Sequence, residues 1–253
     1  MTAVFAPAGA YRAAVAELPL SARLVDAPSG AIVMVPGEPG WVDGALAAAS
    51  AGAVAVLVVD LVFAPSADLR RLAEAGIPIF IERPLLRTDV AADAVAARNA
   101  VSGGMPPRII VAEAAASRAR LTAAMRDAVG WVRTLAGEPP TLVAADEGLA
   151  LLETSIGISA TLTAVVTARP GTGRVRAQAL GEVITDVEVE GRAARVATAS
   201  AAGRMIAPHR FESSERLALR RALEALAENT VPSDIHDLLA DASLVERILQ
   251  PRR

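Results

Sequence analysis

Two kinds of segment alternate through the first half of the chain. Short runs rich in valine, isoleucine and alanine have the pattern of buried strands, and the stretches between them place apolar residues at helical spacing. This alternation predicts β-α-β units around a parallel sheet. The expected strands are Thr2–Ala6, Ala22–Asp26, Ala31–Pro36, Val54–Asp60, Ile77–Glu82 and Arg108–Val111. The expected helices are Gly9–Glu17, Trp41–Ala51, Ser66–Ala75 and Thr88–Ala100.

One connection in this series is unusually short. Only Ala27–Gly30 separates the second expected strand from the third. A crossover helix between parallel strands normally needs a dozen or more residues. The sequence therefore predicts that these two strands are joined without a helix.

The pattern changes after one long expected helix, Ser117–Leu135. From Thr141 onward, apolar and polar residues alternate, which is typical of half-buried antiparallel strands. The expected strands here are Ile158–Thr167, Arg174–Leu180, Val183–Glu190 and Ala193–Ala199. Glycine-containing breaks at 169–173 and 190–192 are typical of hairpin turns. Two helices, Glu212–Glu228 and Ser233–Gln250, close the chain.

Together these patterns predict an α/β fold. A Rossmann-like parallel-sheet domain is expected over residues 1–112, followed over residues 113–253 by an α+β domain with a mostly antiparallel sheet. The two last helices can pack against the first domain in this arrangement.

The composition narrows the possible chemistry. The chain has 253 residues and a formal net charge of −3; it has no cysteine, two histidines, and arginine at all 25 of its basic positions. Schiff-base lysines, thiolate nucleophiles and thiolate metal sites are excluded, and the two isolated histidines predict no metal site. No block of basic residues indicates nucleic-acid binding, and no apolar run is long enough to cross a membrane. We therefore expect a cytoplasmic protein that binds neither nucleic acid nor a membrane.

A short motif carries a resemblance to a known family. The segment Ala75–Leu85 reads Ala-Gly-Ile-Pro-Ile-Phe-Ile-Glu-Arg-Pro-Leu, and it resembles the glucose–fructose oxidoreductase/inositol dehydrogenase family, whose fifth sheet strand ends in Glu-Lys-Pro after an Ala-Gly helix end. The segments 108–138 and 216–249 are also similar. The resemblance implies a dinucleotide-binding Rossmann domain that takes NAD or NADP, and a second domain whose open sheet forms oligomers.

The resemblance also assigns a cofactor turn after the first strand. Where the family has Gly-x-Gly-x-x-Gly, this chain has Ala6-Pro7-Ala8-Gly9-Ala10-Tyr11. The glycines of that motif allow a tight turn and a close approach to pyrophosphate. Here Ala6, Ala8 and Tyr11 stand at the three glycine positions, and Pro7 fixes φ between the first two. Asp26 is either a ribose ligand or a solvated acid at a strand end. Asp60 is a further candidate, because it ends the fourth expected strand at the carboxyl edge where open α/β sheets bind ligands. The candidates for cofactor binding are therefore Ala8, Gly9, Tyr11, Asp26, Asp60 and Glu82.

The catalytic positions are altered as well. Arg83 occupies the position of the family's lysine, and an arginine can hold a substrate but transfers protons poorly. The family's second-domain helix with Asp-x-x-x-His corresponds to 146–157, which contains no histidine. The candidate catalytic residues are therefore Arg83 and His209, each with a structural alternative: a salt-bridged residue for Arg83 and an edge or hairpin residue for His209.

Three hypotheses of function follow. In the first, the chain is an oxidoreductase homologue with eroded cofactor and catalytic motifs. It binds no cofactor and serves as a binding or partner subunit, either in a homo-oligomer or with an active relative through the C-terminal sheet. In the second, it is an active NAD- or NADP-dependent oxidoreductase that acts on a sugar, a polyol or a related small molecule with atypical residues. In the third, it is a small-ligand sensor.

Overall fold

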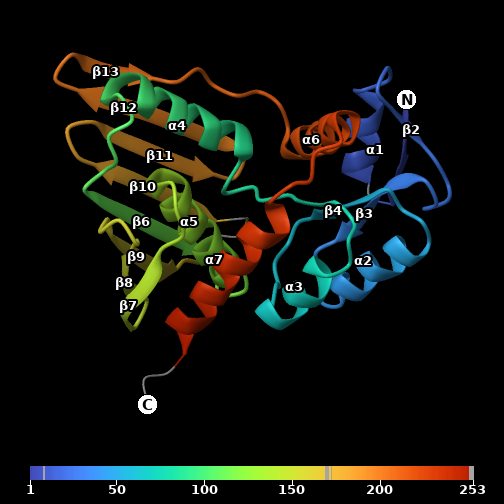
Figure 1. The fold of residues 1–253 in the computed structure, drawn as a ribbon, viewed down its shortest axis with the longest axis horizontal. Helices are drawn as coiled ribbons and strands as arrows, with labels where there is room; N and C mark the ends of the chain where they lie inside the picture. The colour runs from blue at the N-terminus through green and yellow to red at the C-terminus, as the bar shows by residue number, and fades with distance from the viewer. Residues whose placement is uncertain (8, 169–170, 172, 251–253) are drawn as a thin grey trace. The chain divides into compact units, whose positions relative to one another are not determined.

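The protein forms two compact units, each with its own sheet. The computed structural model describes residues 1–7, 9–168, 171 and 173–250. The first unit contains residues 1–83 and 212–239, and the second contains residues 84–211 and 240–253. Figure 1 labels the helices and strands of both units.

The first unit is built on a five-stranded parallel sheet with the order β2-β1-β3-β4-β5. Its strands are β1 (Thr2–Phe5), β2 (Ala22–Leu24), β3 (Ala31–Pro36), β4 (Ala55–Val59) and β5 (Ile79–Ile81). Its helices are α1 (Gly9–Ala16), α2 (Trp41–Ser50), α3 (Ser66–Ala73), α6 (Ser214–Glu228) and the first part of α7 (Asp234–Leu249).

Both faces of this sheet are covered, which explains why its strands are continuous apolar runs. All residues of β4 and β5 are buried. On one face, Leu57 and Phe80 pack in a core with Ala14 of α1 and Leu219 of α6. Helix α2 packs against β3 and β4. Figure 1 shows α1 and α6 on one side of this sheet and α2 and α3 on the other.

The short connection before β3 has the predicted form. Strands β2 and β3 are both parallel to β1 and lie on opposite sides of it, so they do not pair with each other. Residues 25–30 join them without a helix. These six residues carry the chain from one side of β1 to the other.

The second unit is built on an eight-stranded sheet with the order β13-β12-β11-β10-β6-β9-β8-β7. Its strands are β6 (Ile109–Ala116), β7 (Thr141–Asp146), β8 (Leu149–Glu153), β9 (Ser159–Val166), β10 (Arg174–Leu180), β11 (Ile184–Glu190), β12 (Ala193–Ser200) and β13 (Gly203–Ile206). Its helices are α4 (Thr88–Ser102), α5 (Leu121–Ala136) and the end of α7. Within the described strands of this sheet, every pairing is antiparallel except that of β6 with β9.

One face of this second sheet is buried and the other is open. Alternate residues of β6, such as Ile110 and Ala112, pack under α5 around the fully buried Trp131. The intervening residues of the strands face outward. The predicted fold class, a Rossmann-like parallel sheet followed by a mostly antiparallel one, is confirmed.

Three details differ from the sequence prediction. The strand expected at Arg108–Val111 runs to Ala116 and lies inside the second sheet, and the units divide at Arg83/Pro84 rather than near residue 112. The break at 169–173 does not close a hairpin, because β6 lies between β9 and β10; residues 169, 170 and 172 themselves lie outside the described part of the chain. The break at 190–192 does close one, since Glu190 pairs with Ala193.

Candidate functional site

Three of the residues predicted for the site meet at the carboxyl end of the parallel sheet in the first unit. In open α/β sheets, ligands bind in the crevice beyond this edge. Tyr11 lies in the first turns of α1, Asp60 directly follows β4, and Glu82 directly follows β5. The strand order therefore brings together positions that are up to 71 residues apart in the chain.

A hydrogen bond between two of these residues is the centre of the site. The Tyr11 hydroxyl donates to Oε2 of Glu82 over 2.6 Å. The Tyr11 side chain is almost fully buried and packs in the core between α1, α6 and the sheet. Its ring fills this space and its hydroxyl holds the carboxylate at the end of β5.

Asp60 completes the group through its backbone. Its N–H donates to the same oxygen of Glu82 over 3.4 Å. Asp60 has a φ of 50°, in the left-handed region that residues with a side chain rarely adopt. Strained backbone of this kind is concentrated at functional sites.

The electrostatics of this group are unfavourable to negative charge. Burial raises the pKa of Glu82; the hydrogen bond from Tyr11 acts in the opposite direction, and the nearby Glu215 raises it further. Burial and the Glu82 carboxylate also raise the pKa of Tyr11, so the phenol stays protonated. No sequence pattern indicated Glu215, because it lies on α6, more than 130 residues beyond Glu82.

The other predicted residues do not join this group of contacts. Gly9 begins α1, and a Cβ added there would meet nothing within 4 Å. Asp26 is exposed after β2, and Ala8 lies outside the described residues. Arg83 is half-buried and follows Glu82 at the end of the first unit.

His209 belongs to the second unit. It lies after β13 in a segment without regular structure, and its ring contacts the exposed ring of Phe211 at 4.8 Å between centroids.

The structurally demanding glycine in this part of the fold is Gly37, after β3. A Cβ there would lie 2.5 Å from the Leu61 Cα and 2.9 Å from the Val59 carbonyl oxygen. The ends of β3 and β4 therefore approach each other more closely than a side chain allows.

These residues do not fit a dinucleotide held in the way the family resemblance implies. A pyrophosphate is held by backbone N–H donors and by the positive end of the helix dipole at the turn. Pro7 has no N–H, and Tyr11 occupies the third glycine position. The region that corresponds to the family's histidine-bearing helix forms strand β8 and parts of β7 and the following turn.

Comparison with solved structures gives matches over most of the chain. UDP-N-acetylglucosamine 3-dehydrogenase from Acidithiobacillus ferrooxidans matches with a TM-score of 0.63 at 16% identity, covering 95% of this chain and 86% of its own. The aldose-aldose oxidoreductase from Caulobacter crescentus matches with a TM-score of 0.66 at 16% identity, covering 86% of this chain and 75% of its own.

A third match was solved with its cofactor. The 3-ketoreductase from Actinomadura kijaniata, in complex with NADP, matches with a TM-score of 0.64 at 15% identity, covering 86% of this chain and 76% of its own. The chain shares the two-domain α/β fold of these oxidoreductases. At these identities the likeness is one of fold alone, and the family resemblance is supported to that extent. Neither the known protein-family models nor the curated proteins give a match.

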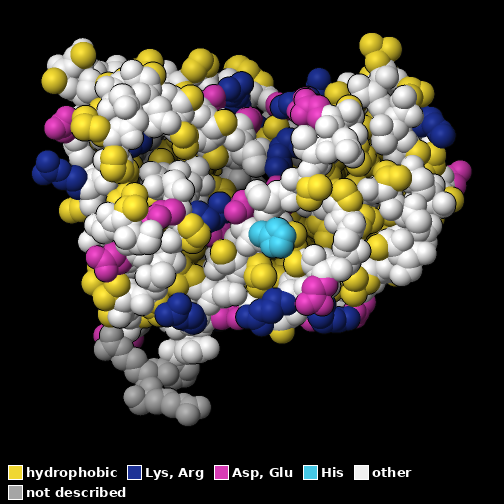
Figure 2. Space-filling model, in the orientation of Figure 1, with side chains coloured by type: hydrophobic (Ala, Val, Ile, Leu, Met, Phe, Trp, Pro, Cys, Tyr) yellow, Lys and Arg dark blue, Asp and Glu magenta, His cyan; other side chains and the backbone are white. Residues whose placement is uncertain are grey.

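Two general features complete the description of this chain. Among the described residues, no helix is long and apolar enough to span a bilayer, and no group of three or more acidic or histidine side chains is placed to hold a metal ion. On the face drawn in Figure 2, basic and acidic side chains are interspersed rather than gathered into areas of one sign.

Proposed function

We propose that this oxidoreductase-fold chain is a non-catalytic binding or partner subunit that does not use NAD or NADP. The observation that carries the proposal is the hydrogen bond from Tyr11 to Glu82. The buried Tyr11 ring fills the space beside the turn after β1, at the position of the third glycine of the cofactor motif, and its hydroxyl is bonded to the carboxylate at the end of β5. Arg83 in the lysine position supports the same reading.

The open face of the second sheet supports the partner role. Its middle carries ion pairs that are already formed, Arg174 with Glu188 and Arg176 with Asp186. Exposed apolar side chains flank them on neighbouring strands. By the strand register these are Ile109, Leu149, Leu151, Val165 and Ile184. A face of this kind can be covered without leaving charges unpaired, so we propose that a second copy or an active relative covers it.

The mass of the protein in solution tests this surface. Light scattering on a sizing column is expected to give a mass above that of the monomer for the parent. Leu151→Arg and Val165→Arg are expected to release monomer, because they place charge in an apolar contact. Phe63→Arg, at an exposed site in the first unit, is the matched control and should leave the mass unchanged. A monomeric parent would contradict the proposed homo-oligomer.

A second candidate is an active NAD(P)-dependent oxidoreductase that acts on a sugar or polyol. The names of the matched structures favour it, since they include a UDP-N-acetylglucosamine dehydrogenase and an aldose-aldose oxidoreductase. Turnover of NAD or NADP with a panel of sugars and polyols distinguishes the two. If the chain has activity that Arg83→Ala lowers, the non-catalytic proposal fails. The expected cytoplasmic location stays a prediction, which cell fractionation would test.

A further inference from the structure

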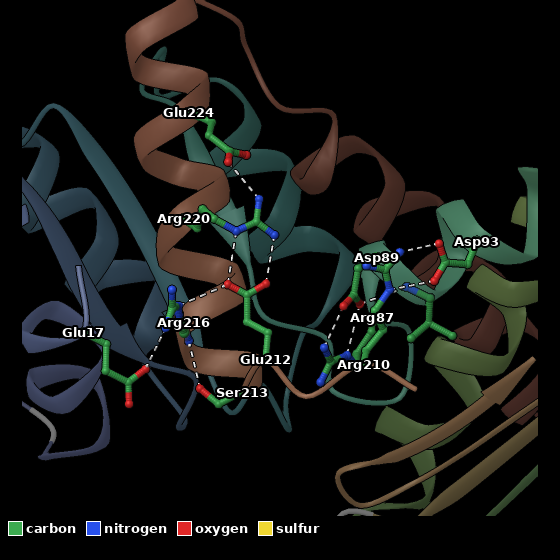
Figure 3. A network of polar contacts seen from close by, with 11 residues as sticks. Glu17, Arg87, Asp89, Asp93, Arg210, Glu212, Ser213, Arg216, Arg220 and Glu224 are labelled. Atoms are coloured by element: carbon green, nitrogen blue, oxygen red, sulfur yellow. Dashed lines mark hydrogen bonds and ion pairs between the residues drawn. The ribbon is translucent and has the colours of Figure 1, made fainter. Parts of the chain in front are cut away.

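The chain crosses between the two units at Phe211, and the residues on either side of it are held by ion pairs. Residues 207–213 have no regular structure, and the division between the units falls between Phe211 and Glu212. The Phe211 side chain is 91% exposed. Figure 3 shows Arg210 and Glu212, the charged residues on either side of it, with their partners on α4 and α6.

On the side of the second unit, Arg210 fastens this segment to α4. Its Nε donates to Oδ2 of Asp93 over 2.7 Å and its Nη2 donates to Oδ1 of the same carboxylate over 2.5 Å. Two parallel bonds fix the orientation of a guanidinium as well as its position. The charge of Arg210 also contributes to lowering the pKa of Asp89, one turn earlier on α4.

On the side of the first unit, Glu212 fastens the segment to α6. Its two carboxylate oxygens accept from Nε and Nη2 of Arg220 over 3.1 and 2.9 Å. The next residue, Ser213, caps α6 by accepting from the Arg216 N–H over 3.2 Å. The chain is therefore fixed again immediately after Phe211.

We propose that Phe211 is the pivot of a hinge that is latched by ion pairs, Arg210 with Asp93 on one side and Glu212 with Arg220 on the other. The backbone freedom of this crossing is confined to about one residue as long as both latches are closed. Hinges of this kind are a few loop residues that absorb the change in φ and ψ between two packed bodies.

The chain passes from one unit to the other at two further points, and the structure at both is consistent with a stiff hinge. At Arg83–Pro84, the preceding Glu82 is held by Tyr11, and the following Leu85 accepts from Trp131 Nε1 over 2.7 Å. The third crossing lies inside α7, which contains no glycine or proline from Asp234 to Leu249. Sharp kinks in helices occur mainly at such residues, so the expected swing is small.

Both latches are partly exposed, with side-chain exposures from 22% to 48%, so salt should weaken them. Exposed ion pairs contribute modestly, which corresponds to a change of about two- to fivefold in the opening equilibrium. The salt concentration should therefore control the opening of the hinge reversibly and to a measurable extent.

Limited proteolysis with chymotrypsin tests the pivot. We expect the first cut after Phe211, giving fragments 1–211 and 212–253. Asp93→Asn should speed it by about two- to fivefold, and Asp93→Asn with Glu212→Gln should also reduce its dependence on salt. Glu224→Gln is the matched control, because it removes an outer partner of Arg220 and leaves Glu212 in place. A first cut elsewhere, or equal rates in all variants, would overturn the proposal.

A distance measurement between the units gives a second, independent readout. The chain has no cysteine, so Leu20→Cys in the first unit and Ile156→Cys in the second provide two unique, exposed sites for spin labels. The distance distribution is expected to broaden in the double latch variant and to match the parent in Glu224→Gln. Equal widths in parent and double variant would contradict the hinge, and circular dichroism verifies that each variant is folded.

Discussion

Glu82 in the first unit and Asp89 in the second are partly buried carboxylates with opposite electrostatic environments. Burial raises the pKa of Glu82, and Glu215 adds to this against the hydrogen bond from Tyr11. Burial also acts to raise the pKa of Asp89, but the hydrogen bonds and charge of Arg87 outweigh it and lower that pKa below its usual value. The Arg87–Asp89 pair is 2.7 Å long.

The two carboxylates differ in whether an arginine lies beside them, and arginine is the chain's one type of basic residue besides histidine. In the second unit, arginines pair with carboxylates at Asp89, Asp186 and Asp241. At the carboxyl edge of the first sheet, the shortest bond to Glu82 comes from a neutral phenol. An arginine stabilises the ionised form of Asp89, whereas the surroundings of Glu82 disfavour its ionised form.

Breaking a buried pair in the second unit should have the largest effect. The Asp241 side chain is 1% exposed, and both its oxygens accept from Arg133, over 3.0 and 3.1 Å. Arg133→Ala should lower the free energy of unfolding by about 3 kcal/mol, because a buried carboxylate loses its charged partner. Urea denaturation measures this. The control Arg71→Ala removes the exposed contacts with Asp43 and Asp68 and should change little.

Removing the Tyr11 hydroxyl in the first unit should lower the free energy of unfolding by a smaller amount. Tyr11→Phe keeps the ring but leaves Glu82 without its shortest hydrogen bond, so we expect a loss of about 1–2 kcal/mol at neutral pH. The same denaturation experiment measures it. A variant as stable as the parent would mean that the bond does not hold the edge of the sheet.

The pH dependence should distinguish the two carboxylates by sign. Because the pKa of Glu82 is raised on folding, its contribution to stability is fully present below the unfolded pKa and is lost as the pH rises through the folded pKa. Glu82→Gln should therefore gain stability relative to the parent as the pH rises across that range. Stability curves from pH about 4 upward would show it, and a flat difference would contradict it.

Asp89 should behave in the opposite way. Its pKa is lowered on folding, so its contribution is present above the unfolded pKa and is lost as the pH falls through the folded one. Asp89→Asn should be less stable than the parent at neutral pH, and the difference should shrink in acid. The same set of curves measures it, and a difference that grows in acid would be incompatible with the Arg87 pair.

The smallest effect is expected on the open face. Arg174 is 42% exposed and contacts Glu188 at 3.3 Å. Arg174→Ala should change the free energy of unfolding by about 0.5 kcal/mol or less, because water and salt screen such pairs. A loss comparable to that of Arg133→Ala would show that this face is covered in solution.

The elements of the first unit were predicted well because their signal is local. Strands such as Ala31–Pro36 are apolar runs rich in β-branched residues, a pattern typical of parallel strands that are buried on both faces. Strand β6 was predicted only in part, since Ala112–Ala116 contains alanine and glutamate, which favour helices. Pairing with β10 and β9 overrides that propensity, and it also moves the division between the units away from residue 112.

The candidate site was predictable as a set of residues but not as a set of contacts. Tyr11 and Glu82 were found through the motif positions they occupy. Their hydrogen bond depends on the strand order and on how far the ring reaches across the sheet, which no local pattern encodes. The part of α6 that brings Glu215 near them comes from the far end of the chain.

Calorimetric titration of the parent protein with NADH and NADPH tests the central claim most directly. If the bond from Tyr11 to Glu82 closes the carboxyl edge of the sheet, neither nucleotide should give a saturable heat up to about 1 mM, which corresponds to binding weaker than about 4 kcal/mol. Saturable binding of either nucleotide at submillimolar concentration would contradict the account.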